Sequence, residues 1–384
     1  MAKPLKRPGR AVKIKPGITA FMPDRLPPVL TWTPALLRAL SEADRLIGWL
    51  AGEGGRLANP HLLMRPFLTR EAVLSSRIEG TQATLGEILA SDAGAVVDRS
   101  PDDLKEVANY VAALDYGIER LKTLSLSTPL ILEIHEKLMH DVRGEHATPG
   151  EFRRTQNWIG APGCTLIDAT YVPPPPDMLT ECMAGLEAFL QDTTLPPLVQ
   201  IALAHYQFEA IHPFLDGNGR VGRLLITLFL VERGVLPTPM LYLSAFFEAT
   251  RNHYYERLRS VSSKGNWEAW LIYFFNGIAR QAEDALNRAE TINDLMARWR
   301  SEVAMIPSRV LPQILDCLAA NPYITAKKLS EDMGIAFTTA QRAIDKLVSL
   351  GIVKEVRQTR RDRVYCAQGI LNVLEQPARL VASG

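Results

Sequence analysis

The segment His212–Arg223 (HPFLDGNGRVGR) carries the residues of this chain that are best suited to phosphate chemistry. Gly217 and Gly219 permit positive φ angles and a close approach of backbone to ligand, and an apolar run with helical character follows them. Because the first N–H groups of a helix are free and its N-terminus is the positive end of the dipole, this turn predicts a nest for an anion. The segment is not a Walker A loop, since no Lys-Ser or Lys-Thr pair follows the glycines.

Four side chains of the same segment could complete a polyphosphate site. Arg220 and Arg223 are three residues apart and share a helical face, so their guanidinium groups could hold two phosphates. Asp216 offers a hard oxygen to a divalent cation such as Mg²⁺, and His212 could accept a proton from an attacking hydroxyl. The alternative is a capped helix start with a core histidine and two solvated arginines. Each residue alone fits that alternative, but the joint pattern favours a site.

Composition indicates an ordinary globular protein of two to three domains. The chain has 384 residues, of which 47% are hydrophobic and 22% charged, and 43 basic and 42 acidic groups leave a net charge of +1. This balance disfavours a surface that binds polyanions globally, although a local basic patch is compatible with it. Four well-separated cysteines without a CxxC pair predict neither a zinc knuckle nor a disulfide framework. With no apolar stretch of about 20 residues and no signal peptide, we expect a cytoplasmic protein without membrane contact.

The spacing of apolar residues predicts a mainly α fold. Helical periodicity runs through most of the chain, including residues 34–50, 60–78 and 197–211. Two segments depart from it, since residues 157–172 and 352–366 alternate like short hairpins. Glu79 ends one predicted helix just before Gly80, where a carboxylate opposes the helix dipole unless a cation compensates it.

The string from His212 matches HxFx(D/E)GNGRxxR, the signature of the Fic (Fic/Doc) family, at every fixed position, and residues 30–300 resemble that family. The resemblance implies a Fic-fold helical bundle that transfers AMP from ATP to a Ser, Thr or Tyr hydroxyl of a protein and releases diphosphate. His212 would be the general base and Asp216 would hold Mg²⁺. The implied nucleotide-binding residues are Gly217, Asn218, Gly219, Arg220, Val221, Gly222 and Arg223. Phosphate-transferring relatives of the Doc type carry Lys where Gly219 stands, so the sequence favours nucleotidyl transfer.

The stretch from Ser75 to Gly80 is similar to the inhibitory motif (S/T)xxxE(G/N) of Fic proteins that carry their own N-terminal brake. The resemblance implies that Glu79 pairs with Arg223, occupies the γ-phosphate position and misplaces the α-phosphate of ATP. The alternative is a chance match at a helix end, which the presence of the His212 signature further along the chain makes less favoured.

Two further segments resemble parts of the family. The hairpin Trp158–Val172 is similar to the flap that holds a target segment by main-chain strand addition, with an ordinary surface hairpin as the alternative. Tyr254 and Tyr255 resemble a tyrosine pair that lines the adenine site, with plain core aromatics as the alternative. Ser262 stands where some relatives have Asn, so recognition of the base could differ in this chain.

The C-terminal unit resembles a winged helix-turn-helix domain. Helices, a turn and a hairpin follow one another over residues 308–366, and Phe337–Leu350 would be the recognition helix. Residues 325–366 hold nine basic and five acidic residues, a net charge of +4 that DNA phosphates could attract. Winged helices also serve in protein interaction and dimerisation, so a homodimer is compatible with this unit.

These observations together predict five regions and leave three functions open. The regions are a basic irregular arm (1–30), an N-terminal helical region with the inhibitory helix (31–125), the Fic catalytic core (126–275), a linking helix (276–305) and the winged-helix domain (306–384). The favoured function is a protein adenylyltransferase inhibited by Glu79, whose targets could include the protein itself. The alternatives are a DNA-binding regulator that uses the Fic fold as a nucleotide sensor, and an enzyme that removes AMP with Glu79 orienting a water.

Overall fold

The computed structural model describes residues 8–54, 60–142, 148–161, 163–237, 239–357 and 363–378, and it is mainly helical, as the sequence predicts. The N-terminal helices are α1 (Pro34–Gly54), α2 (Pro60–Ile78), α3 (Leu85–Asp92) and α4 (Pro101–Arg120). The core helices are α5 (Thr128–Leu138), α6 (Leu179–Gln191), α7 (Pro197–Ile211), α8 (Asn218–Glu232), α9 (Ser244–Ala249), α10 (Arg251–Lys264) and α11 (Trp267–Ala304). Among the described residues, no helix is both long and apolar enough to cross a membrane.

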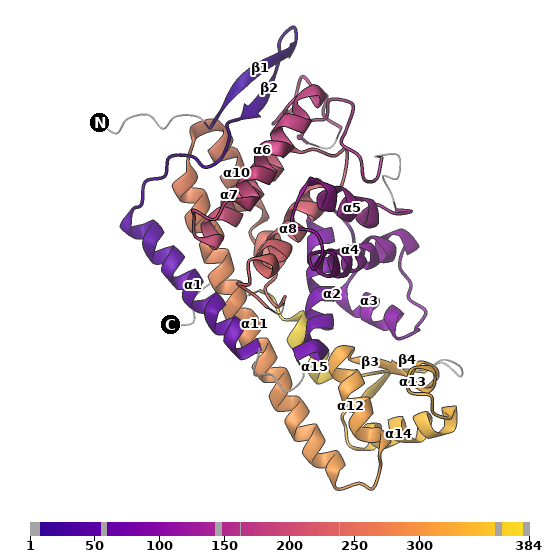
Figure 1. Cartoon of the computed structure of the whole chain (residues 1–384). Coiled ribbons are helices and arrows are strands. Elements are labelled where there is room, and N and C mark those ends of the chain that lie inside the picture. Colours follow the sequence, from indigo (N-terminus) through magenta and orange to yellow (C-terminus); the bar gives the residue numbers. More distant parts are fainter. Residues whose placement is uncertain are drawn as a thin grey trace.

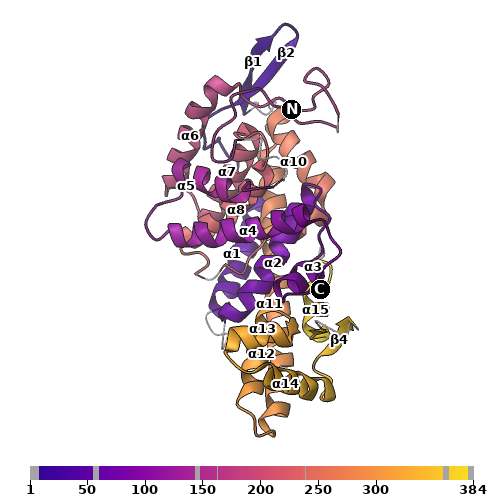
Figure 2. The same cartoon turned by 90° about the vertical axis from the view of Figure 1, so that its right-hand side faces the viewer.

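The fold is an elongated helical body with a small β-ribbon at one end and the C-terminal domain at the other (Figures 1 and 2). Helix α11 runs most of this length, with α1 packed along it (Figure 1). The expected boundary between the core and the linking helix therefore falls inside one continuous helix, Trp267–Ala304. An uninterrupted 38-residue helix gives the two ends of the molecule a rigid connection.

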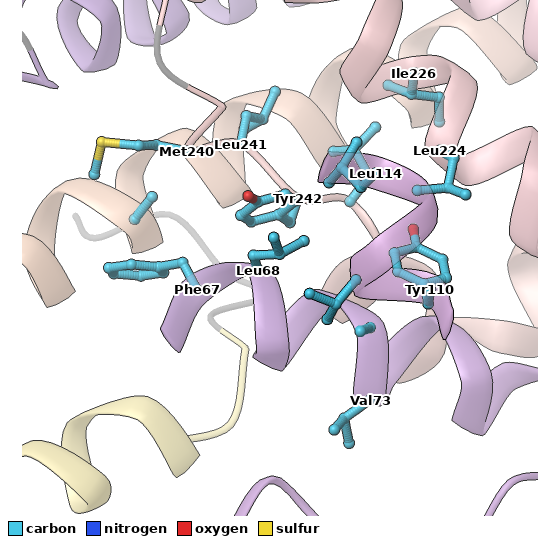
Figure 3. Packing of buried hydrophobic residues seen from close by; sticks show 14 of the residues in the cluster. Phe67, Leu68, Val73, Tyr110, Leu114, Leu224, Ile226, Met240, Leu241 and Tyr242 are labelled. Atoms are coloured by element: carbon cyan, nitrogen blue, oxygen red, sulfur yellow. The ribbon is translucent and has the colours of Figure 1, made fainter. Parts of the chain in front are cut away.

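Helices α7 and α8 occupy the centre of the core because they are apolar on nearly every side. All residues of α7 from 198 to 211 except Glu209 are buried, and α8 is buried from 220 to 230. A helix without a polar face has to be surrounded by other elements. Figure 3 shows side chains from α2, α4, α8 and the segment before α9 meeting in this core, namely Phe67, Leu68, Val73, Tyr110, Leu114, Leu224, Ile226, Met240, Leu241 and Tyr242.

The N-terminal segment differs from the expected irregular arm. Residues 9–23 form an antiparallel hairpin of β1 (Gly9–Lys15) and β2 (Ile18–Pro23), whose turn includes Gly17 at φ +77°. In β1, half-buried Val12 and Ile14 alternate with exposed basic residues, which is a strand pattern. The prediction was wrong here because the basic composition and the prolines concealed this alternation. Residues 1–7 of the arm lie outside the described residues.

The hairpin expected at residues 157–172 is reduced to a single bridge between Ile159 and Tyr171. Pro173–Pro176 ends the second arm directly after this pair, since proline cannot donate to a ladder. Residues 157–172 are called the flap below. Residue 162 lies outside the described residues.

The C-terminal domain is a winged helix-turn-helix, as predicted. Its elements are α12 (Val310–Ala320), β3 (Tyr323–Thr325), α13 (Ala326–Met333), α14 (Phe337–Ser349), β4 (Lys354–Arg357), β5 (Val364–Cys366) and α15 (Gln368–Glu375), with the sheet order β3-β5-β4. The domain is tied to α3, because Asn321 Nδ2 donates to the Leu89 carbonyl at 2.9 Å and Thr325 Oγ1 donates to the Ala93 carbonyl at 3.0 Å. Residues 358–362 of the expected wing lie outside the described residues.

Candidate active site

The loop between α7 and α8 is closed by its own side chains. His212 ends α7 in a left-handed conformation (φ 50°), and Gly217 precedes α8 at φ 77°. The Asn218 side chain bridges the loop, because its Oδ1 accepts from the Phe214 N–H and its Nδ2 donates to the Phe214 carbonyl, both at 2.8 Å. Phe214 is fully buried and stacks on His135 at 3.7 Å between ring centroids. The loop is therefore a rigid turn that fixes the position of His212 relative to α8.

His212 lies at the buried side of this turn. Its Nδ1 is buried and has no hydrogen-bond partner among the described residues. Burial, together with the nearby Arg153 guanidinium, lowers the pKa of His212 to about 4. Arg153 also donates from Nε to the His212 carbonyl at 2.9 Å, which ties the base of the flap to the loop. The imidazole is thus neutral at pH 7 and able to accept a proton.

Arg223 and Glu79 form a close ion pair between the start of α8 and the end of α2. Arg223 NH2 donates to Glu79 Oε1 at 2.7 Å, and its Nε donates to Ser75 Oγ at 2.8 Å. The Arg223 side chain is 2% exposed and that of Glu79 is 35% exposed. Burial by itself would lower the pKa of Arg223, but the Glu79 carboxylate raises it above its ordinary value. Burial favours the neutral acid of Glu79, yet Arg223 lowers the pKa of that carboxyl.

The Glu79 carboxylate lies where the sequence predicts a bound anion. A Cβ atom on Gly219 would come within 2.2 Å of Glu79 Oε1 and 2.9 Å of Arg223 NH1, so these groups lie directly against the first turn of α8. Arg220 and His212 also lower the pKa of Glu79 electrostatically. The structure therefore brings together His212, the α8 N-terminus and both arginines.

Arg220 has unused hydrogen-bonding capacity. Its side chain is 4% exposed, and its NH1 lies 4.0 Å from Glu106 Oε2, while NH2 lies 3.5 Å from both Met139 Sδ and Asp216 Oδ1. Its Nε and NH1 have no hydrogen-bond partner among the described residues. A buried guanidinium with unpaired donors is suited to an incoming phosphate oxygen.

Asp216 could hold a metal ion together with phosphates. Its side chain is 52% exposed, and its Oδ1 accepts the Gly217 N–H at 2.5 Å. Within the described ranges, no group of three or more His, Cys, Asp or Glu side chains could hold a metal by itself. One accessible carboxylate fits Mg²⁺, which protein sites often bind through one or two carboxylates, substrate phosphates and water.

The remaining motif residues lie in different surroundings. Val221 is fully buried and packs in the core. A Cβ atom on Gly222 would come within 2.4 Å of Glu209 Oε1, so this glycine permits close packing of α8 on α7. These positions support the loop through the backbone and packing of α8.

The two tyrosines predicted for the adenine site point in different directions. Tyr254 is buried, and its hydroxyl lies 2.8 Å from His205 Nε2 in an aromatic cluster. Tyr255 is 43% exposed; partial burial raises the pKa of its phenol, and the nearby Glu79 carboxylate adds to this rise. Tyr255 therefore stays a candidate for contact with a base, whereas Tyr254 is a core residue. Ser262 contacts the Tyr206 hydroxyl at 2.9 Å.

Three residues near the site were not among the predicted site residues. His135, considered only as a packed helix residue, joins two loops, since its Nε2 lies 3.1 Å from the Asp216 carbonyl and its Nδ1 accepts from the Gly150 N–H. Arg153 anchors the flap base, as described above. Glu209 has a buried Oε1 without a hydrogen-bond partner among the described residues, and burial raises its pKa to about 7. The signal for Glu209 was available in the sequence, because it is the only carboxylate in the mainly apolar helical run Pro197–Ile211.

Family models and known proteins match the parts of the chain that form this site. The model described as Fic/DOC family N-terminal matches residues 37–119, that of the Fic/DOC family matches residues 125–230, and that of a winged helix-turn-helix DNA-binding domain matches residues 310–354. A curated relative from Drosophila grimshawi, "Protein adenylyltransferase Fic", is 34% identical over 166 residues. The match covers 42% of this chain and 32% of that relative, so the chain matches about a third of the relative's length.

Solved structures show a similar fold. A Fic family protein from Desulfovibrio desulfuricans superposes with a TM-score of 0.60 at 22% identity, over 89% of this chain and 98% of the other. Fic-1 from C. elegans superposes with a TM-score of 0.52 at 23% identity, over 67% of this chain and 75% of the other. The helical bundle and its closed loop thus define a Fic-fold protein. The chain carries a Fic/DOC N-terminal domain and a Fic/DOC domain, followed by a C-terminal winged helix-turn-helix domain.

Proposed function

We propose that this chain transfers AMP from ATP to a hydroxyl group of a protein and that Glu79 inhibits the transfer. The observation that carries the proposal is the position of the Glu79 carboxylate, which lies over Gly219, pairs with Arg223 and lies near His212. An anionic group of the protein occupies a site built for anions, as an internal substitute for a phosphate of the substrate would. The names of the adenylyltransferase relatives support the same reaction.

The chemistry follows from the groups around the loop. The neutral His212 ring accepts the proton of the target hydroxyl, whose oxygen then forms a bond to the α-phosphorus of ATP. The bond from that phosphorus to the bridging oxygen breaks, and diphosphate leaves with the electron pair. Arg220, Arg223 and the N–H groups of the α8 N-terminus stabilise the negative charge on the phosphates. Mg²⁺ held by Asp216 would neutralise phosphate charge when bound.

The test is label transfer from ATP to protein by the wild type, His212→Ala and Glu79→Gly. We expect label from α-labelled ATP and none from γ-labelled ATP, with the highest level for Glu79→Gly and none for His212→Ala. Transfer of the γ label would indicate a kinase-like reaction instead. No transfer by any variant, combined with release of AMP from a protein modified beforehand, would support AMP removal, in which the ionised Glu79 orients a water.

The winged helix-turn-helix domain supports DNA binding as a second function. Helix α14 exposes Thr338, Thr339, Arg342 and Lys346 to solvent. Such a row of polar and basic side chains on a recognition helix suits the major groove and its phosphates. We expect the full chain to shift duplex DNA in a gel at low salt, with loss of the shift at high salt and in the double variant R342E/K346E. An unchanged shift by the variant would exclude α14 as the DNA-binding surface.

A further inference from the structure

The N-terminal ribbon β1–β2 is a basic element that the proposed reaction does not yet use. It extends at the end of the molecule opposite the winged-helix domain (Figures 1 and 2), and β2 packs against α7, the helix that precedes the loop. The sequence contains no acidic residue before Asp24, and within the ribbon Arg10, Lys13 and Lys15 are exposed. Lys13 and Lys15 are both exposed on either side of half-buried Ile14, at the point where the pairing of β1 with β2 shifts its register.

The ribbon is joined to the flap. The Phe21 N–H of β2 donates to the Val172 carbonyl at 2.8 Å, and the Phe21 and Tyr171 rings lie 5.9 Å apart. Tyr171 in turn exchanges two backbone hydrogen bonds with Ile159, at 2.8 and 3.0 Å. Strand β2 therefore lies beside the second arm of the flap and covers that side, which leaves the first arm, residues 157–160, as the side to which another strand could add.

The ribbon is also fixed in position relative to His212. The Tyr171 hydroxyl donates to the Ala210 carbonyl at 2.7 Å, and Gln207 Nε2 donates to the Asp24 carbonyl at 3.0 Å. Both contacts are made to α7, the helix that ends at His212. A segment held on the flap with its hydroxyl at His212 would consequently meet a ribbon whose charges have a defined place.

We propose that the ribbon and the flap form one docking platform, and that the basic strand β1 selects protein targets with acidic residues beside the modified hydroxyl. The inference rests on the proposed AMP transfer. An exposed strand that carries only positive charges attracts an acidic segment and repels a basic one, which raises the rate of productive encounter as well as the affinity. Lysines also protect edge strands from aggregation, but protection alone gives no reason for the ribbon to be joined to the flap. Nucleic acid is a less suitable occupant, because the ribbon and α14 lie at opposite ends of the molecule (Figure 1).

The binding test uses the full chain and a defined probe. The probe is a fluorescein-labelled peptide in which glutamates alternate with Ser, Thr and Tyr, and its counterpart has glutamines at those positions. The double variant K13E/K15E reverses two charges of the ribbon, while R38E/R45E reverses two exposed charges on α1 and serves as the matched control. Because two exposed attractive charges become repulsive, we expect roughly tenfold weaker binding of the acidic peptide by K13E/K15E. The control variant and the glutamine peptide should show no such change.

The outcomes separate this inference from the function on which it rests. The inference would be overturned if wild type and K13E/K15E bind the acidic peptide with equal affinity, whether or not the variant aggregates. The lysines would then serve only to protect the edge strand from aggregation. Duplex DNA binding that is lost in K13E/K15E but kept in R342E/K346E would overturn it in favour of nucleic acid. Self-labelling by Glu79→Gly with α-labelled ATP is the control for AMP transfer. Its absence would remove the proposed function and this inference together, whereas labelling with equal peptide affinities would remove the inference alone.

Discussion

Replacing Glu79 by glycine should increase AMP transfer, because it removes the group that competes with ATP for Arg223. In the wild type, ATP must displace a carboxylate whose Oε1 lies 2.7 Å from Arg223 NH2. After the replacement, Arg223 keeps its bonds to Ser75 Oγ and the Ser75 carbonyl, so the guanidinium stays in place with a free donor for a phosphate.

The size of the effect follows from the strength of this contact. Hydrogen bonds to charged groups contribute about 1.5–3 kcal/mol, but the 35% exposure of the Glu79 side chain allows water to screen the pair. An effective cost of about 1–2 kcal/mol corresponds to a five- to thirtyfold gain in kcat/KM for ATP. Glu79→Gln should give a smaller gain, since the amide can still accept from Arg223 but carries no charge.

The assay is the initial rate of self-labelling with α-labelled ATP over a range of ATP concentrations. Glu302→Gly is the matched control, because Glu302 is an exposed carboxylate in the last turn of α11, remote from the loop. Equal rates for wild type and Glu79→Gly, or an equal gain in Glu302→Gly, would contradict inhibition by the Glu79 carboxylate. A decrease in Glu79→Gly would instead indicate that the carboxylate takes part in the reaction.

Four further predictions follow from the same contacts. With a pKa of about 4, His212 should stay neutral down to about pH 5. A histidine with the ordinary pKa of 6.5 would lower the transfer rate roughly tenfold at pH 5.5, and a pH–rate profile of this protein should not show that fall. Asp216→Asn should weaken the dependence of the rate on Mg²⁺ concentration, measured by titration of the metal, while an unchanged dependence would remove Asp216 as its ligand. Gly219→Ala should place a methyl group against Glu79 and Arg223 and lower the melting temperature, measured by thermal denaturation, and an unchanged melting temperature would contradict the close contact. The pKa of Glu209 is about 7 in the folded protein and 4.5 ordinarily, so the stability of the wild type falls as the pH rises through this interval. Glu209→Gln should therefore be more stable than the wild type at pH 8, by up to about 3 kcal/mol. Thermal denaturation should show a higher melting temperature for the variant at pH 8 and no difference near pH 5.

The class of fold and the composition of the loop could be predicted from the amino-acid sequence. Periodic apolar residues define helices such as α2, α7 and α14 within a few residues, because the helical period depends only on local spacing. The twelve residues from His212 could be identified in the same way, since a phosphate-binding turn needs its glycines, arginines and acidic group at fixed short separations. The upstream carboxylate Glu79 was also found by a local signal, its place at the end of a helix before Gly80.

Which groups meet, and in what state of protonation, depends on the packing of elements that are far apart in the chain. Glu79 and Arg223 are 144 residues apart, and their 2.7 Å contact depends on how α2 packs against α8. Burial then lowers the pKa of His212 and raises that of Glu209, and burial is a property of the whole packed core. The ribbon at residues 9–23 was not predicted from the sequence, because it too depends on contacts between separate segments. Its strands are held by pairing with each other and by contacts to the flap and α7, so the composition of a short segment could not reveal them.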